Sequence, residues 1–84
     1  MKFFLSLALG FAFLLASVDI NNADEKELST LQGVGDKKAK EIITYRDTNG
    51  CFKSSDELTK VKGISEKTVA KNKDAIIIGT CKKQ

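Results

Sequence analysis

The feature that most constrains this chain is an internal repeat, because residues 27–39 resemble the residues that follow 30 positions later. Glu27-Leu28 aligns with Glu57-Leu58, and Gly33-Val34 aligns with Gly63-Ile64. Self-similarity at a fixed period indicates two copies of one supersecondary unit that stack on each other. Since the chain has only 84 residues, we expect the two copies to form one small domain.

Each copy has the pattern of a short helix, a tight turn and a second helix. Asp24 with Glu27, and Ser54 with Glu57, have the spacing of a capping box, which marks the start of a helix. Helices are therefore predicted over residues 24–31, 36–48, 55–60 and 66–75. Residues 76–78 are three β-branched isoleucines. Without a visible partner strand, we expect them to be a helix end or an extended tail on the core.

The helix predicted over residues 36–48 carries an apolar stripe. Ala39, Ile42 and Ile43 fall on one face, and the stem of Arg46 extends that face by one further turn. Further core positions are expected at Val18, Ile20, Tyr45 and Phe52. The pattern as a whole predicts an all-α fold.

The two turns, residues 32–35 and 62–65, contain the residue types of an anion site. Glycine allows a positive φ and a close approach of the backbone. With Val34 and Ile64 pointing inward, the backbone N–H groups would face outward beside the next helix N-terminus. Lysines flank both turns, at Lys37, Lys38, Lys62 and Lys67. Two such sites suit a repeating anion, a nucleic-acid backbone; the alternative is two plain helix connections with lysines that serve solubility.

Both turns with their flanks resemble the helix-hairpin-helix DNA-binding motif, at residues 31–39 and 61–69. Residues 18–21, 45–54 and 58–64 are similar to ComEA-type competence proteins. The resemblance implies two helix-hairpin-helix units packed as one small SAM-like bundle after an N-terminal signal segment. It also implies sequence-independent binding of double-stranded DNA by its phosphate backbone, during DNA uptake for natural transformation. The DNA-uptake machinery is then a further expected partner.

The resemblance assigns DNA binding to the turns and their flanking residues. These are Gly33, Val34, Gly35, Lys37, Lys38, Lys62, Gly63, Ile64, Ser65 and Lys67. Ser65 stands where the motif usually has glycine, and it can cap the helix that follows. Asp36 stands where the family often has proline, which places a negative charge near the expected phosphate.

The N-terminal segment has the pattern of a secretory signal, because Lys2 precedes an apolar run over residues 3–16. As a helix, the sixteen residues 1–16 would span ~24 Å, short of the ~30 Å hydrocarbon core of a bilayer. We therefore expect a signal peptide at 1–17, the tandem domain at 18–81, a basic tail at 82–84 and a periplasmic location. The alternative is an uncleaved anchor that faces outside the cytoplasm, and only then would a membrane be a partner.

Two cysteines, Cys51 and Cys81, are present. Export to an oxidising compartment favours a disulfide between them, and a small core gains from such a cross-link. The alternative is two unrelated buried thiols.

The absence of histidine limits the chemistry. Two cysteines alone cannot complete a four-ligand zinc site, and a catalytic triad would lack its base. We therefore expect no catalytic residue, no metal, no cofactor and no small-molecule substrate. The competing function is structural, since the double fold also resembles an extrinsic subunit of photosystem II that packs against proteins. The lysines beside both turns favour DNA.

Overall fold

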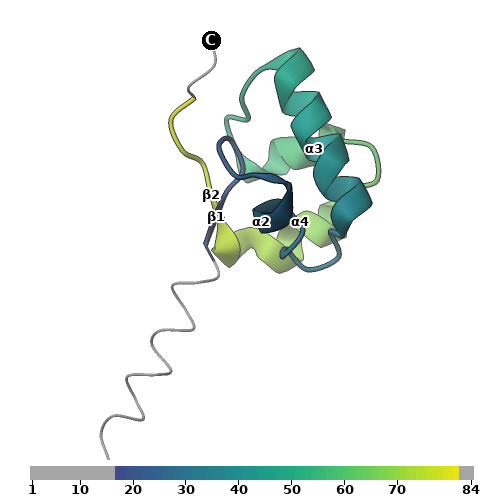
Figure 1. The fold of residues 1–84 in the computed structure, drawn as a ribbon. Coiled ribbons are helices and arrows are strands. Elements are labelled where there is room, and N and C mark those ends of the chain that lie inside the picture. The colour runs from purple at the N-terminus through teal and green to yellow at the C-terminus, as the bar shows by residue number, and fades with distance from the viewer. Residues whose placement is uncertain (1–16, 82–84) are drawn as a thin grey trace, which may run out of the picture.

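Each copy of the repeat forms two helical segments joined by a tight turn, in a computed structural model that describes residues 17–81. In the first copy, α2 (Glu25–Leu28) precedes α3 (Asp36–Asn49). In the second copy, the 3-10 helix η1 (Ser55–Lys60) precedes α4 (Glu66–Asn72), and η2 (Lys73–Ala75) continues α4. The long helix α3 lies along one side of the domain, beside the shorter segments (Figure 1). The all-α prediction is confirmed, and the expected tail at 82–84 and all but Ser17 of the expected signal lie outside the described residues.

The start of α2 follows the capping rule, whereas the start of η1 does not. Asp24 Oδ1 accepts a hydrogen bond from Glu27 N at 2.9 Å, and Glu27 Oε1 accepts one from Asp24 N at 3.0 Å. The second expected capping box is wrong, because Ser54 forms no side-chain cap hydrogen bond. Glu57 N donates to the Ser54 carbonyl at 3.2 Å, which is the i→i+3 bond of a 3-10 turn. The Glu57 carboxylate accepts from Lys53 N instead.

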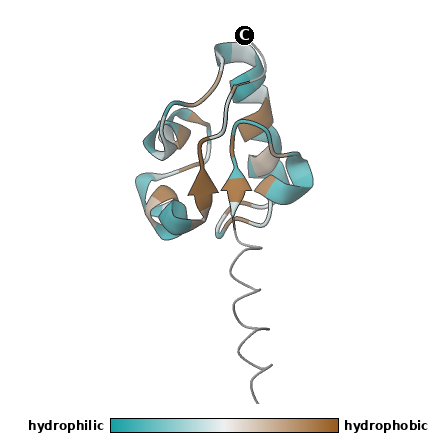
Figure 2. Ribbon diagram, turned by 90° about the vertical axis from the view of Figure 1, so that its left-hand side faces the viewer, coloured by the Kyte–Doolittle hydropathy of each residue, from teal (hydrophilic) through white to brown (hydrophobic). Residues whose placement is uncertain are grey.

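Two short strands join the ends of the domain. β1 (Val18–Asp19) pairs in parallel with β2 (Ile76–Ile77), with Val18 opposite Ile76. The strands lie side by side and point the same way (Figure 2). Residues 76 and 77 are extended and Ile76 packs against the core, as the extended-tail alternative has it, but the expectation that they have no partner strand is wrong. Their partner strand comes from the other end of the domain, and a local sequence pattern does not reveal so distant a pairing.

The core draws on equivalent positions of both copies. The aligned pairs that are buried are Leu28 and Leu58, Leu31 and Val61, Val34 and Ile64, and Ala39 and Val69. The expected stripe on α3 is confirmed, because Ala39 and Ile42 are buried and Ile43 packs against the core. The repeat thus builds one shared core, and burial of these apolar side chains is the main stabilising contribution.

The Cys51–Cys81 disulfide, with a Cα–Cα distance of 5.8 Å, holds the segment after β2 against the loop after α3. Polar side chains from the start of the domain hold the same segment. Gly79 N donates to Asp19 Oδ1 at 3.0 Å, and Asn21 Nδ2 donates to the Gly79 carbonyl at 3.0 Å. The predicted pairing of the two cysteines is confirmed. Within residues 17–81, no helix has the length and apolar character needed to cross a bilayer.

Candidate nucleic-acid interface

The turns between the helical segments, residues 32–35 (turn 1) and 62–65 (turn 2), have the same backbone conformation. Gly33 has φ +78° and Gly63 has φ +90°, in the left-handed region that glycine adopts without strain. The next N–H closes each turn, because Val34 N donates to Leu31 O at 3.0 Å and Ile64 N donates to Val61 O at 3.1 Å. One local geometry therefore occurs twice, as the repeat predicts.

The apolar residue at the centre of each turn anchors it to the core. Val34 is 4% exposed and Ile64 is 5% exposed, so neither side chain is available to a ligand. The flanking residues Gly33, Gly35 and Ser65 are exposed, as is Gly63. Each turn thus presents backbone to solvent while its central side chain is fixed inside.

The two turns lie next to each other, because a side chain from each copy packs against the turn glycine of the other copy. A Cβ built on Gly63 would lie 3.5 Å from both Cγ and Cε of Lys38. A Cβ built on Gly33 would lie 3.7 Å from both Cγ2 and Oγ1 of Thr68. Lys38 and Thr68 occupy equivalent positions of the repeat, so the copies interlock reciprocally. This reciprocity places both turns at one site.

The helices that follow the turns begin differently. Ser65 Oγ accepts a hydrogen bond from Thr68 N at 3.2 Å, so the expected N-cap of α4 is present. The N-cap of α3 is Gly35, which forms no side-chain cap hydrogen bond. The first-turn N–H groups of a helix have no partner within the helix. A side chain thus caps the first turn of α4, whereas the first turn of α3 has no side-chain cap from Gly35.

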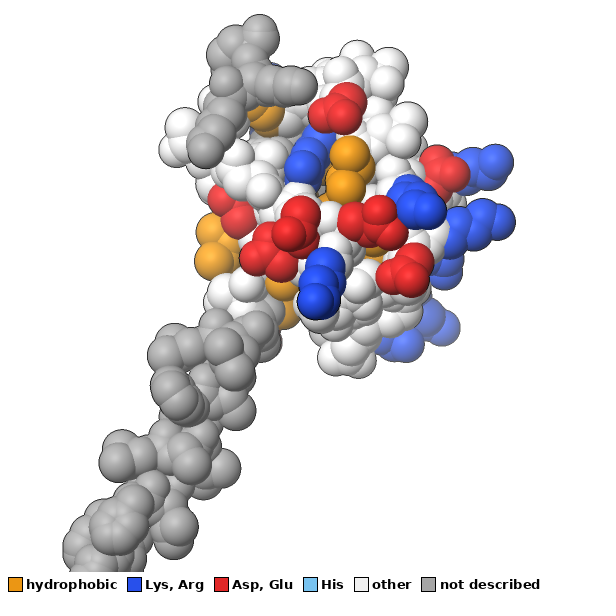
Figure 3. All heavy atoms as spheres, viewed as in Figure 1, with side chains coloured by type: hydrophobic (Ala, Val, Ile, Leu, Met, Phe, Trp, Pro, Cys, Tyr) orange, Lys and Arg blue, Asp and Glu red, His pale blue; other side chains and the backbone are white. Residues whose placement is uncertain are grey.

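The flanking lysines fall into two groups. Lys37, Lys62 and Lys67 are exposed, whereas Lys38 is half-buried and its Nζ donates to the Gly33 carbonyl at 3.3 Å. Lys and Arg side chains project along the edge of the domain on the side of α3, and Asp and Glu gather on the face toward the viewer (Figure 3). A polyanion would therefore approach that basic edge.

Two residues of the second copy that the sequence did not single out shape the site. Thr68 contacts Gly33, as described above. Asn72, 4% exposed, donates from Nδ2 to the Gln32 carbonyl at 2.9 Å and accepts at Oδ1 from Gln32 N at 2.8 Å. Asn72 aligns with Ile42 in the repeat. A polar residue at an apolar stripe position signals a buried hydrogen-bonded role, and that signal was available in the sequence.

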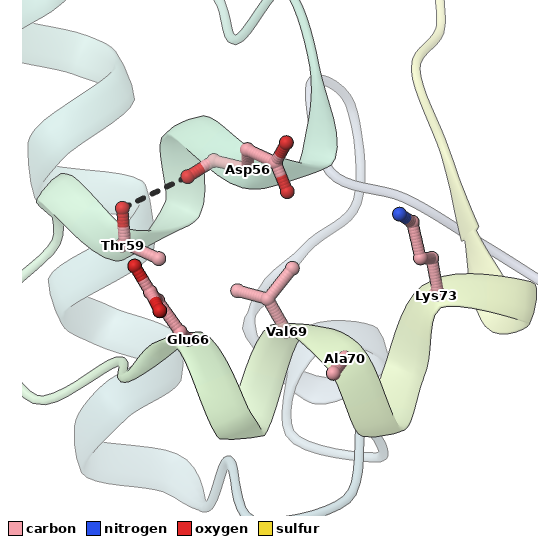
Figure 4. Close-up of a pocket in the computed structure, with 6 residues that line it drawn as sticks. All are labelled: Asp56, Thr59, Glu66, Val69, Ala70 and Lys73. Carbon is pink, nitrogen blue, oxygen red and sulfur yellow. Dashed lines mark hydrogen bonds between the residues drawn. The ribbon is translucent and has the colours of Figure 1, made fainter.

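A shallow hollow of about 360 Å³ lies between η1 and α4. Figure 4 shows its lining residues, Asp56, Thr59, Glu66, Val69, Ala70 and Lys73. Thr59 Oγ1 donates to the Asp56 carbonyl at 2.9 Å, a bond within η1 itself. Its lining has two carboxylates, Asp56 and Glu66, and one ammonium, Lys73, so the charge of the hollow disfavours a polyanion. Among residues 17–81, no group of three or more His, Cys, Asp or Glu side chains is placed to hold a metal ion.

The domain consists of two pairs of helical segments, each joined by a glycine turn, and the two turns lie against each other. This arrangement defines a double helix-hairpin-helix domain. The chain matches the family described as "Helix-hairpin-helix motif" over residues 16–77, and it belongs to that family.

The chain is also similar to several known proteins. It is 46% identical to ComE operon protein 1 of Bacillus subtilis over 63 residues, which are 75% of this chain and 31% of that protein. It is 51% identical to kinesin-like protein KIF22-B of Xenopus laevis over 51 residues, 61% of this chain and 8% of that protein. It is 41% identical to an uncharacterized protein of Haemophilus influenzae over 61 residues, 71% of this chain and 54% of that protein. The chain thus spans about half or less of each relative, and the resemblance to ComEA-type competence proteins is confirmed.

Proposed function

We propose that the chain binds double-stranded DNA without sequence preference, as a non-catalytic protein of DNA uptake in natural transformation. The observation that carries the proposal is the reciprocal contact of Lys38 with Gly63 and of Thr68 with Gly33. Because of it, the two exposed turns form one continuous surface flanked by exposed lysines. A surface with two equivalent anion sites suits a ligand whose charges repeat.

The chemistry of the turns favours phosphate over base contacts. Backbone N–H groups and lysine ammonium groups bind phosphate oxygens, which position a protein on DNA but carry no sequence information directly. The aromatic pair Tyr45 and Phe52 stack on each other, with ring centroids 5.5 Å apart. Phe52 is buried, so the pair does not offer a platform for unpaired bases. These features support sequence-independent binding of a duplex.

We further propose that the chain is exported and acts in the periplasm, where it holds incoming DNA. The disulfide supports this location, since such bonds persist in oxidising compartments. Similarity to ComE operon protein 1 supports the link to uptake. Cell fractionation tests the location, and recovery in the cytoplasm with reduced cysteines would contradict it. Recovery with the membrane fraction would indicate an uncleaved anchor.

The binding test is fluorescence anisotropy of the purified protein with labelled duplexes of several unrelated sequences, each titrated at several salt concentrations. With about four phosphates neutralised, log K should fall with log salt at a slope of about −3.6, equally for all sequences. A flat salt response, or a strong preference for one sequence, would contradict the proposal. Nicking of a labelled plasmid in the presence of Mg²⁺ would contradict the non-catalytic part. A stoichiometric protein partner without DNA retention would favour the structural alternative.

A further inference from the structure

We propose that the aliphatic stem of Lys38 acts as a spacer that sets the separation of turn 1 and turn 2. Lys38 is then a positioning residue, and its effect on the ligand comes through the turns it holds apart. The inference rests on the proposed function, because it concerns how both turns engage one duplex.

The contacts of Lys38 join both turns. The residue lies in the first turn of α3, directly after turn 1, and its Nζ donates to the carbonyl of Gly33 in that same turn. Its Cγ, Cδ and Cε atoms pack against Gly63 in the other turn, within 3.8 Å of the position that a Cβ would take there. The side chain is thus held at its end by turn 1 while its middle supports turn 2. Its neighbour Lys37 is exposed.

The reciprocal position is filled differently. Thr68 contacts Gly33 through a short side chain, and Thr68 Oγ1 lies 3.1 Å from Ser65 Oγ in its own turn. The Thr68 carbonyl also accepts from Asn72 Nδ2 at 2.8 Å. One half of the contact is therefore made by a short side chain, and the other half depends on a long side chain that is held only at its backbone and at Nζ. The separation of the turns is consequently most sensitive to Lys38.

The spacing matters because the phosphates of a duplex repeat at fixed intervals, with one phosphate of each strand per about 3.4 Å of helix axis. When one turn is bound, the other binds with an effective concentration that depends on whether its position matches the next available phosphates. Loss of the spacer would let the turns shift. The second contact would then be weakened without any change in the number of charges.

The decisive experiment compares Lys38→Met with Lys38→Ala, because both variants lose the same charge and only the first keeps a long apolar stem. We expect Lys38→Met to bind a labelled duplex about three- to tenfold more tightly than Lys38→Ala, with parallel salt slopes. The matched control pair is Lys37→Met and Lys37→Ala, whose affinities should agree within about twofold. Equal affinities of the two Lys38 variants would overturn the spacer.

A coupled measurement separates spacing from a local effect. In a Lys67→Glu background, which weakens turn 2, the difference between Lys38→Met and Lys38→Ala should shrink to within about twofold. An undiminished difference would overturn the proposal, because the stem would then act on turn 1 alone. Thermal unfolding identifies variants that fail to fold.

If Lys38→Ala does not fold, Lys38→Leu provides the deciding variant, since it loses the same charge and stays apolar but has no atom at the Cε position that lies against Gly63. We expect Lys38→Leu to bind more weakly than Lys38→Met at an unchanged salt slope, and equal affinities of these two variants would overturn the proposal. A wild-type protein that does not bind DNA would overturn the proposed function and the spacer together. If the wild type binds DNA and the two Lys38 variants bind it with equal affinity, the spacer role of Lys38 is overturned and the proposed function is not.

Discussion

The side-chain amide of Asn72 forms two hydrogen bonds with the backbone of Gln32, one through its nitrogen at 2.9 Å and one through its oxygen at 2.8 Å. These bonds join residues 40 positions apart. They fix turn 1, in the first copy, to α4 in the second. The geometry of turn 1 is therefore determined partly by the copy to which it does not belong.

Replacing Asn72 with isoleucine, the residue at the equivalent position of the first copy, should lower the free energy of unfolding by about 2 to 3 kcal/mol. The change leaves the Gln32 N–H and carbonyl without their partner in a half-buried site. Urea unfolding measures the loss. The control is Asn49→Ala, whose exposed hydrogen bond to the Tyr45 carbonyl should cost less than about 1 kcal/mol. Similar losses for both variants would show that the buried amide has no special role.

Replacing Gly33 with alanine should cost about 1 to 2 kcal/mol of stability, because φ at this position is +78° and a Cβ is strained there. Space is not the cause, since the nearest atoms to such a Cβ are at an ordinary contact distance of 3.7 Å. Gly33→Asn is the matched control, because asparagine tolerates the left-handed region better than alanine does. Thermal unfolding should show that the asparagine variant is more stable than the alanine variant. An alanine variant as stable as wild type would contradict the assigned strain.

The double variant Lys37→Glu, Lys67→Glu should weaken duplex binding by at least tenfold for every sequence tested, and it should reduce the magnitude of the salt slope by about 2. Both side chains are exposed beside the turns, at equivalent positions of the repeat. Lys26→Glu with Lys73→Glu changes the net charge equally at exposed positions outside the turns. Gel-shift titration compares the two. Equal losses would show that binding depends on overall charge, and binding that survives the first pair would contradict the assignment of the turns.

Stability should fall as the pH drops through about 4 and below, partly through Asp19. Burial alone would raise the pKa of Asp19. Hydrogen bonds from the Asn22 side chain and from the N–H groups of Asn21 and Gly79 outweigh burial and hold the pKa below its usual 3.8. In this pH range the unfolded chain binds the proton more readily, so stability is present above the unfolded pKa and lost as pH falls through the folded value. Urea unfolding from pH 6 to pH 2 should show a weaker decline for Asp19→Asn. An identical pH profile for both proteins would contradict the role of Asp19.

Reduction of the Cys51–Cys81 disulfide should lower the free energy of unfolding by about 3 to 4 kcal/mol, since the bond closes a loop across a sequence separation of 30. Unfolding with and without a reductant measures the change. The control is the double variant Cys51→Ser, Cys81→Ser. Its free energy of unfolding should match that of the reduced wild type and should not change when the reductant is added. A reductant effect below about 1 kcal/mol would show that the polar contacts around Gly79 suffice to hold this segment.

Several features of the fold could be read from the sequence because they depend on local or repeated patterns. The capping pair Asp24 and Glu27 marks the start of α2, and the apolar stripe marks the inner face of α3. The pairing of β2 with β1 could not be read in the same way, since Ile76 and Val18 come together only when the domain closes. The second capping pair failed for a local reason. The backbone around Ser54 adopts a 3-10 turn that satisfies the Glu57 N–H directly.

The sequence alone determined the repeat, the two turns and the residues that flank them, because glycine and the spacing of apolar side chains restrict the local backbone. Only the tertiary structure decided that Lys38 lies against Gly63 and Thr68 against Gly33. The reason is physical: neither copy can bury its apolar face alone, so the shared core sets how the copies meet. The relation between the two turns is thus a property of their packing, which no single segment contains.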